Sequence, residues 1–261
     1  MIPSDEFIDW VFAATRWAFD EVLYPESVLA REAFVLPTWD DFPVDESLEG
    51  EALAEDYFAF VREHIGMTDD DLEVELVPRE PASPAKILEG MAHHMTGPVE
   101  GGGVLLREGD PLPIEYDPEL VSDPLLLVAV LSRGLTHWMC APCPEPPGGE
   151  ESFHFAVDLV WVLLGFGVFA SSCAHRSTAH ERGGMIGWGV SRFGALGPLE
   201  LAYCTGLFAE LLELDDRDAG EHLGANARAW LADARKDLRR RHADRVAALR
   251  AGRPATGPYR H

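Results

Sequence analysis

Residues 125–140 form a strongly apolar segment, LLLVAVLSRGLTHWMC, with polar side chains near its C-terminal end. This length and composition predict a buried helix, on which Arg133 and His137 share a face because they are four residues apart. The zinc-binding motif H-E-x-x-H places two histidines at the same spacing. Here Arg133 and Gly134 stand where the first histidine and the glutamate would be. A site descended from a metal site would therefore lack one ligand and the group that activates water.

A second predicted helix begins near Glu150 and carries a polar stripe on an otherwise apolar cylinder. The stripe consists of Glu151, His154 and Asp158, at positions i, i+3 and i+7. The short Pro-rich connection at 141–149 favours an antiparallel pair of helices. This pairing would bring His154 and Asp158 close to the face that carries Arg133 and His137.

Two chemistries fit this arrangement. In one, His137, His154 and Asp158 bind a divalent metal such as zinc, and Glu151 orients or deprotonates a water molecule. In the other, the guanidinium of Arg133 takes the place of the metal and pairs with Asp158. A buried arginine repels a nearby cation, so Arg133 favours the second arrangement. The sequence favours a purely structural role, in which these side chains satisfy one another in the core, over either catalytic interpretation.

The remaining pattern predicts an α+β fold, a helix-rich domain with a small sheet in its N-terminal half. Ser4 is the expected N-cap of the first helix. Helices are expected at 5–23, 51–64, 119–139, 151–173, 198–214 and 222–250, strands at 33–37, 72–77, 104–106 and 112–116, and loops at 141–149 and 183–197. The predicted organisation is one domain over 1–220, a basic C-terminal helix over 221–250 and a disordered tail over 251–261.

The net charge of −24 is unevenly distributed. Residues 225–261 contain ten Arg or Lys and three Asp, which makes this segment +7 and the body −31. An acidic body argues against binding to nucleic acid or to an anionic membrane. The basic segment is expected to lie against the protein's own acidic surface or in solvent, in preference to binding RNA.

Location and cysteine chemistry follow from simpler observations. The polar, acidic start of the chain lacks the pattern of a secretory signal, which favours a cytoplasmic location. The apolar run 159–174 is shorter than the roughly 20 residues that span a bilayer, so it predicts a buried helix. Within it, Gly165 to Ala170 matches G-x-G-x-x-A, but without a βαβ context the small residues predict close helix packing. The four cysteines are expected to be free thiols.

Five segments, in order, resemble a family of uncharacterised bacterial proteins with a zincin-like H-E-x-x-H helix. They are 33–43, 60–67, 114–137, 150–172 and 199–212. The resemblance implies a zincin-like α+β domain of the metallohydrolase type. It matches His137 to the second histidine of the motif and Asp158 to an acidic position on the next helix. The first histidine and the glutamate fall on Arg133 and Gly134, so the motif is degenerate here.

The sequence thus predicts a catalytically degenerate zincin-like protein that binds a protein partner or a small molecule. Arg133, His137 and Asp158 would form a charge network without a cofactor, and an active metallopeptidase is not expected. One alternative is a metal-dependent hydrolase with zinc on His137, His154 and Asp158 and Glu151 as its base. Another is an acidic interaction or immunity-type protein, which the charge of the body allows.

Overall fold

A computed structural model describes residues 1–45, 47–67, 74–79, 112–182, 185–215 and 217–252. Helices dominate, with two small sheets, so the α+β class is confirmed. The helices are α1 (Asp5–Trp17), α2 (Pro25–Leu29), α3 (Gly50–Ile65), α5 (Pro124–Cys140), α6 (Phe153–Trp161), α7 (Gly167–Cys173), α8 (Pro198–Leu212), α9 (Arg217–Glu221), α10 (Ala225–Arg241) and α11 (Ala243–Arg250). Short helical turns are η1 (Ala18–Val22), η2 (Pro118–Ser122), η3 (Glu150–Ser152) and η4 (Val162–Phe166).

Local signals set several helix ends as the sequence predicts. The hydroxyl of Ser4 accepts a hydrogen bond from the amide of Phe7 at 3.2 Å and caps α1. Gly66 ends α3 in the left-handed conformation, with φ of 84°. The predicted helix at 119–139 begins later than expected, because Asp123 caps α5 and a separate turn, η2, precedes it.

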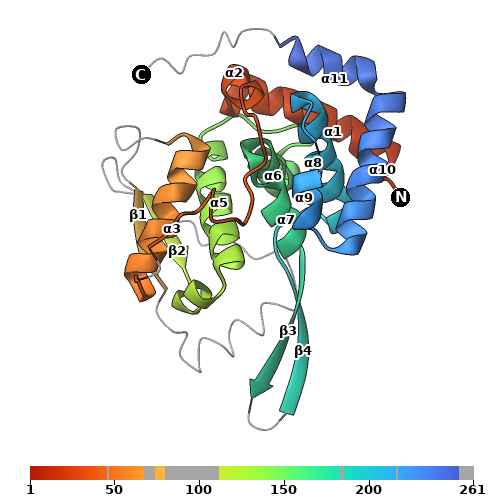
Figure 1. Cartoon of the computed structure of the whole chain (residues 1–261). Coiled ribbons are helices and arrows are strands. Elements are labelled where there is room, and N and C mark those ends of the chain that lie inside the picture. Colours follow the sequence, from red (N-terminus) through yellow and green to blue (C-terminus); the bar gives the residue numbers. More distant parts are fainter. Residues whose placement is uncertain (46, 68–73, 80–111, 183–184, 216, 253–261) are drawn as a thin grey trace.

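The two sheets lie on different parts of the helical body. Strands β1 (Val74–Pro78) and β2 (Leu112–Tyr116) pair in parallel beside α3 and α5. They confirm the predicted strand at 112–116 and, over its described residues 74–77, the one at 72–77. The strand predicted at 104–106 lies outside the described residues. Strands β3 (His175–Arg182) and β4 (Met185–Arg192) form an antiparallel hairpin that projects from the helices (Figure 1). The prediction of a loop over 183–197 is therefore wrong for residues 185–192.

The strand predicted at 33–37 is also wrong. This segment is a loop, buried at Phe34 and Val35, whose backbone bonds to a helical turn and to a side chain. The amide of Val35 donates to the carbonyl of Gly165 at 3.1 Å, and the amide of Leu36 donates to Asp41 Oδ2 at 3.1 Å. An apolar run bounded by polar residues has the same pattern whether it pairs with a strand or is buried as a loop.

The predicted helix at 151–173 is interrupted at Gly165, which has a φ of +97°. Gly167 then lies so close to α8 that a Cβ atom there would be 2.6 Å from Thr205 Oγ1. The small residues of the G-x-G-x-x-A pattern thus allow a kink and close helix packing, as the sequence indicates. The whole run Glu150–Cys173 is long and apolar enough to cross a membrane, but 83% of its most apolar stretch of 18 residues is buried inside the protein. It forms the centre of the core.

The core lies where α5, α6, α7 and α8 meet, with α1 and α3 packed around them (Figure 1). Its largest fully buried side chains come mainly from these helices: Trp161, Tyr203, Phe166, Phe169, Phe208, Ile8, Leu127, Leu131, Leu135, Leu159, Leu163 and Leu201.

The helix predicted at 222–250 is two helices, because the chain turns at His242 (φ −130°) between α10 and α11. Five arginines of these two helices pair with acidic groups of the body. These ion pairs are Arg235 and Arg239 with Glu210, Arg241 with Asp5, Arg245 with Asp9, and Arg250 with Glu213. The expectation that the basic segment lies against the protein's own acidic surface is confirmed for α10 and α11.

The kink at Gly165 should be intolerant of a side chain. We expect Gly165→Ala to lower the free energy of unfolding by about 1 to 3 kcal/mol, because its φ is positive and a Cβ would be 3.1 Å from Val35 Cγ2. Denaturant unfolding measures the change. Gly220→Ala in α9 is the control, because its Cβ would make ordinary contacts at 3.7 Å or more. Equal stability of the two variants would contradict the constraint.

Candidate functional site

The ion pair expected between the two helices is present. Arg133 on α5 donates through Nε to Asp158 Oδ1 on α6 at 2.7 Å. Asp158 is fully buried, whereas 22% of the Arg133 side chain is exposed. His137 lies one turn after Arg133 on α5, and His154 lies one turn before Asp158 on α6. Because the rings of these two histidines also meet, the helices run antiparallel.

The second oxygen of Asp158 is bound by a loop that precedes α8. The amides of Ala195 and Leu196 donate to Oδ2 at 2.6 and 2.8 Å. Gly194 makes this approach possible, since its φ is +85° and a Cβ there would be 2.9 Å from the same oxygen. Sequence reasoning missed this loop, because backbone amides carry no residue signature. The available signal was the run Phe-Gly-Ala-Leu-Gly at 193–197, in which a glycine flanks the Ala-Leu pair on each side.

Aromatic and hydroxyl side chains close the apolar side of the ion pair. The ring of Phe193 lies 6.0 Å from the guanidinium carbon of Arg133 and 5.9 Å from the ring of Trp161. Trp161 donates through Nε1 to the hydroxyl of Ser132 at 2.8 Å, and Ser132 donates to the carbonyl of Val128 at 2.6 Å. The buried polar groups here therefore have partners, as expected for a stable core.

His137 and His154 stack near the surface, with ring centroids 6.1 Å apart and an interplanar angle of 20°. His154 is exposed and His137 is partly buried, with the ring of Phe153 edge-on at 5.3 Å. Burial, and then the nearby His154 and Arg133, lower the pKa of His137 below its ordinary value. The neutral form of His137 is thus favoured.

The structure does not gather the predicted metal ligands into a metal site. Both oxygens of Asp158 already accept hydrogen bonds, from Arg133 and from the two loop amides. Glu151, the candidate base, is exposed on η3, ahead of α6. Across the described residues, no group of three or more His, Cys, Asp or Glu side chains is placed to hold a metal ion. These residues do not fit a zinc ion, because a cationic guanidinium lies against the carboxylate that would bind it.

All four cysteines are free thiols, which confirms the expectation. Cys140 is buried at the end of α5, and Cys143 follows in the connecting loop. Burial raises the pKa of both thiols, so neither is poised as a thiolate nucleophile or metal ligand.

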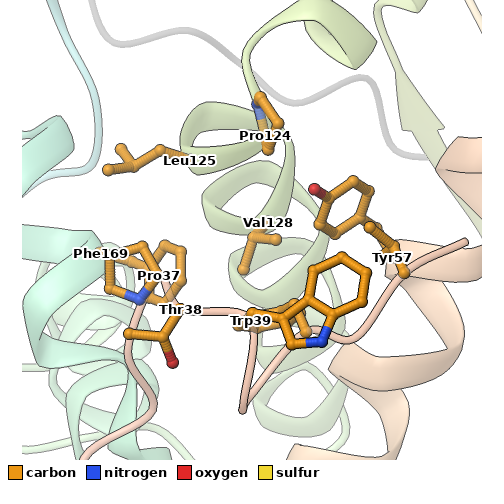
Figure 2. Close-up of a pocket in the computed structure, with 10 residues that line it drawn as sticks. Pro37, Thr38, Trp39, Tyr57, Pro124, Leu125, Val128 and Phe169 are labelled. Atoms are coloured by element: carbon orange, nitrogen blue, oxygen red, sulfur yellow. The ribbon is translucent and has the colours of Figure 1, made fainter. Parts of the chain in front are cut away.

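A cavity of about 320 Å³ lies over the N-terminal half of α5. Figure 2 shows Pro37, Thr38 and Trp39 of the loop at 33–43 on one side, with Tyr57 of α3 and Phe169 of α7 flanking α5. The complete lining is Pro37, Thr38, Trp39, Phe42, Val44, Tyr57, Pro124, Leu125, Val128 and Phe169. Sequence reasoning missed this cavity, since it assigned residues 33–37 to a strand.

Hydrogen bonds and ring contacts fix the loop that forms the cavity wall. Asp41 Oδ2 accepts from the hydroxyl of Thr38 at 3.0 Å, and His64 Nε2 donates to the carbonyl of Asp41 at 2.8 Å. The ring of Phe42 packs between those of Tyr57 and Phe169, at centroid distances of 6.1 and 5.7 Å. The cavity is thus preformed by a loop with fixed geometry, as is usual for small-molecule sites.

Comparison of the chain with models of protein families, with curated proteins and with solved structures found no match.

Removing one partner of the buried ion pair should destabilise the fold. We expect Arg133→Ala to lower the free energy of unfolding by about 3 kcal/mol or more, because Asp158 would stay buried without its cation. Denaturant unfolding at neutral pH measures this. Arg79→Ala is the control, because Arg79 and Glu115 form an exposed pair whose loss costs at most about 1 kcal/mol. Unchanged stability of Arg133→Ala would rule out a stabilising pair.

The stacked histidines predict a pH dependence. Since the folded-state pKa of His137 is lowered, its contribution to stability is complete above the unfolded value of about 6.5 and is lost as the pH falls through the folded-state pKa. An NMR titration of the His137 ring should give a midpoint below about 6.5. In His154→Gln the midpoint should rise, because one neighbouring cation is removed. A wild-type midpoint at or above the ordinary value would refute this assignment.

Proposed function

We propose that the protein is a catalytically degenerate, zincin-like protein that acts by binding a partner or ligand. The observation that carries this proposal is that both carboxylate oxygens of Asp158 already accept hydrogen bonds, from Arg133 and from the amides of Ala195 and Leu196. Asp158 is the residue that the family resemblance matches to the acidic position. Arg133 is the residue that it matches to the first histidine of the motif.

This arrangement disfavours metallohydrolase chemistry on physical grounds. A zinc ion beside Asp158 would have to displace Arg133, whose positive charge repels it. Displacement would also break a 2.7 Å charge-assisted hydrogen bond to a fully buried carboxylate. Gly134 supplies no base at the position of the motif glutamate, and Glu151 is exposed one element away.

Binding, in contrast, has a place in the fold. The cavity over α5 is preformed and lined mostly by apolar side chains, which is the usual character of a ligand site.

The proposal includes a cytoplasmic location. Its support is the burial of the one described helical run long and apolar enough to cross a membrane.

The degenerate motif can be tested by restoring it. We expect Arg133→His combined with Gly134→Glu to bind about one zinc ion per chain, because the two introduced side chains, together with His137, would complete the motif and free Asp158. Position 134 has room for a side chain, since a Cβ there would be 3.4 Å from the nearest atom, in the flexible side chain of Ile114, and the zinc ion would supply the positive charge that Asp158 loses with Arg133. Calorimetric zinc titration gives the affinity and the stoichiometry.

The single variant Gly134→Glu is the matched control, because it adds the carboxylate but keeps Arg133. It should fold and bind no zinc at this site. A double variant that folds, by circular dichroism and cooperative unfolding, but binds no zinc would count against the zincin-like part of the proposal.

A further inference from the structure

We propose that the cavity over α5 binds a small apolar organic molecule that carries a cationic ammonium group. This inference rests on the proposed binding function and specifies the chemical class of its ligand. It is carried by three properties of the cavity: an aromatic, uncharged lining, a small volume and carboxylates beside its lining residues.

The lining suits an apolar body with a positive charge. Of its ten residues, none is charged, and only Thr38, Trp39 and Tyr57 carry polar side-chain atoms. Four are aromatic: Trp39, Phe42, Tyr57 and Phe169. The faces of aromatic rings attract cations, tryptophan most strongly, and such rings line sites for quaternary ammonium ligands.

Trp39 is the most unusual member of this lining. It is 56% exposed, although most large apolar side chains of the protein are buried. Figure 2 places the rings of Trp39 and Tyr57 on the same side of the cavity. An exposed tryptophan beside an apolar hollow gains buried area and ring contacts when a ligand fills that hollow.

The volume limits the size of the ligand. At about 320 Å³, the cavity is near the lower end of the range of about 300 to 1,000 Å³ for small-molecule sites. A single ring system or a short alkyl chain fits this space.

The residues next to the lining in the chain are acidic, which favours a cation over an anion. Five aspartates are chain neighbours of lining residues: Asp40, Asp41, Asp45, Asp56 and Asp123. Burial, together with the negative charge of Asp56, raises the pKa of Tyr57, so the neutral phenol faces the cavity. No arginine, lysine or histidine lines the cavity. The negative charge of these aspartates would weaken binding of a fatty acid and strengthen binding of an ammonium group.

Two basic side chains beside the loop at 33–43 bond to backbone carbonyls. Arg31 donates to the carbonyl of His64 at 2.7 Å, and His64 donates to the carbonyl of Asp41 while its ring lies against Phe42. Arg31 and His64 thus support the shape of this loop and do not line the cavity.

Three probes with the same alkyl body and different head groups test the proposal. They are octyltrimethylammonium, octanol and octanoate, titrated into the protein by calorimetry and by tryptophan fluorescence. We expect the ammonium probe to bind at least about tenfold more tightly than octanoate, with octanol between them, and added salt to weaken only the ammonium probe.

Variants locate the bound probe. Leu125→Trp should abolish binding by filling the cavity from its rim, and Trp39→Ala should weaken the ammonium probe at least about fivefold. Phe155→Ala is the control for Trp39, because Phe155 is also an exposed aromatic residue, at 40%, but does not line the cavity. Asp40→Asn should weaken only the ammonium probe. Asp20→Asn is the control, because Asp20 is also exposed but neither lines the cavity nor adjoins a lining residue in the chain.

Each outcome decides something different. If octanol binds as tightly as the ammonium probe, or octanoate binds more tightly, the charge class is wrong while a ligand-binding cavity stands. If a folded Leu125→Trp binds all probes as the wild type does, or if the wild type binds none of them, the cavity is not the site. Neither result affects the proposal of a degenerate metal motif, which the zinc titration tests separately.

Discussion

The structure depends on one buried carboxylate. Asp158 is inaccessible to solvent in the middle of an apolar helix, where an unpaired charge would cost several kcal/mol. Its partners come from two separate elements: Arg133 on α5 and the loop amides of Ala195 and Leu196 before α8. The carboxylate therefore fixes the antiparallel packing of α5 and α6 and the entry of the chain into α8. The same three hydrogen bonds use the atoms that a metal ion would need.

A second buried carboxylate attaches the C-terminal helices in a similar way. Glu210 on α8 accepts hydrogen bonds from Arg235 and Arg239 on α10, and Arg235 also donates to the carbonyl of Leu214. Both sites place an acidic residue on a central helix and its arginine on a neighbouring one. The arginines of this basic segment thus hold α10 against α8, and the positive charge of the segment complements the negative charge of the body.

The sequence predicts the parts of this arrangement that follow from local periodicity. Helical spacing places Arg133 and His137 on one face of the first helix and His154 and Asp158 on one face of the next, and the short connection makes the two helices antiparallel. The sequence does not predict the loop around Gly194, because the groups that donate to Asp158 there are backbone amides, which do not depend on residue type. The buried loop that includes Val35 has the apolar pattern of a strand, so periodicity alone assigns it wrongly. The cavity depends on that loop and was missed with it.

The central claim is that Arg133 occupies the place of a metal ion at Asp158, and metal content tests it most directly. Untagged protein, purified without chelator, should contain no stoichiometric zinc, manganese or iron by elemental analysis. It should also retain none after zinc loading and dialysis. About one tightly held metal ion per chain, lost in a folded His137→Ala variant, would contradict the account and restore the hydrolase interpretation.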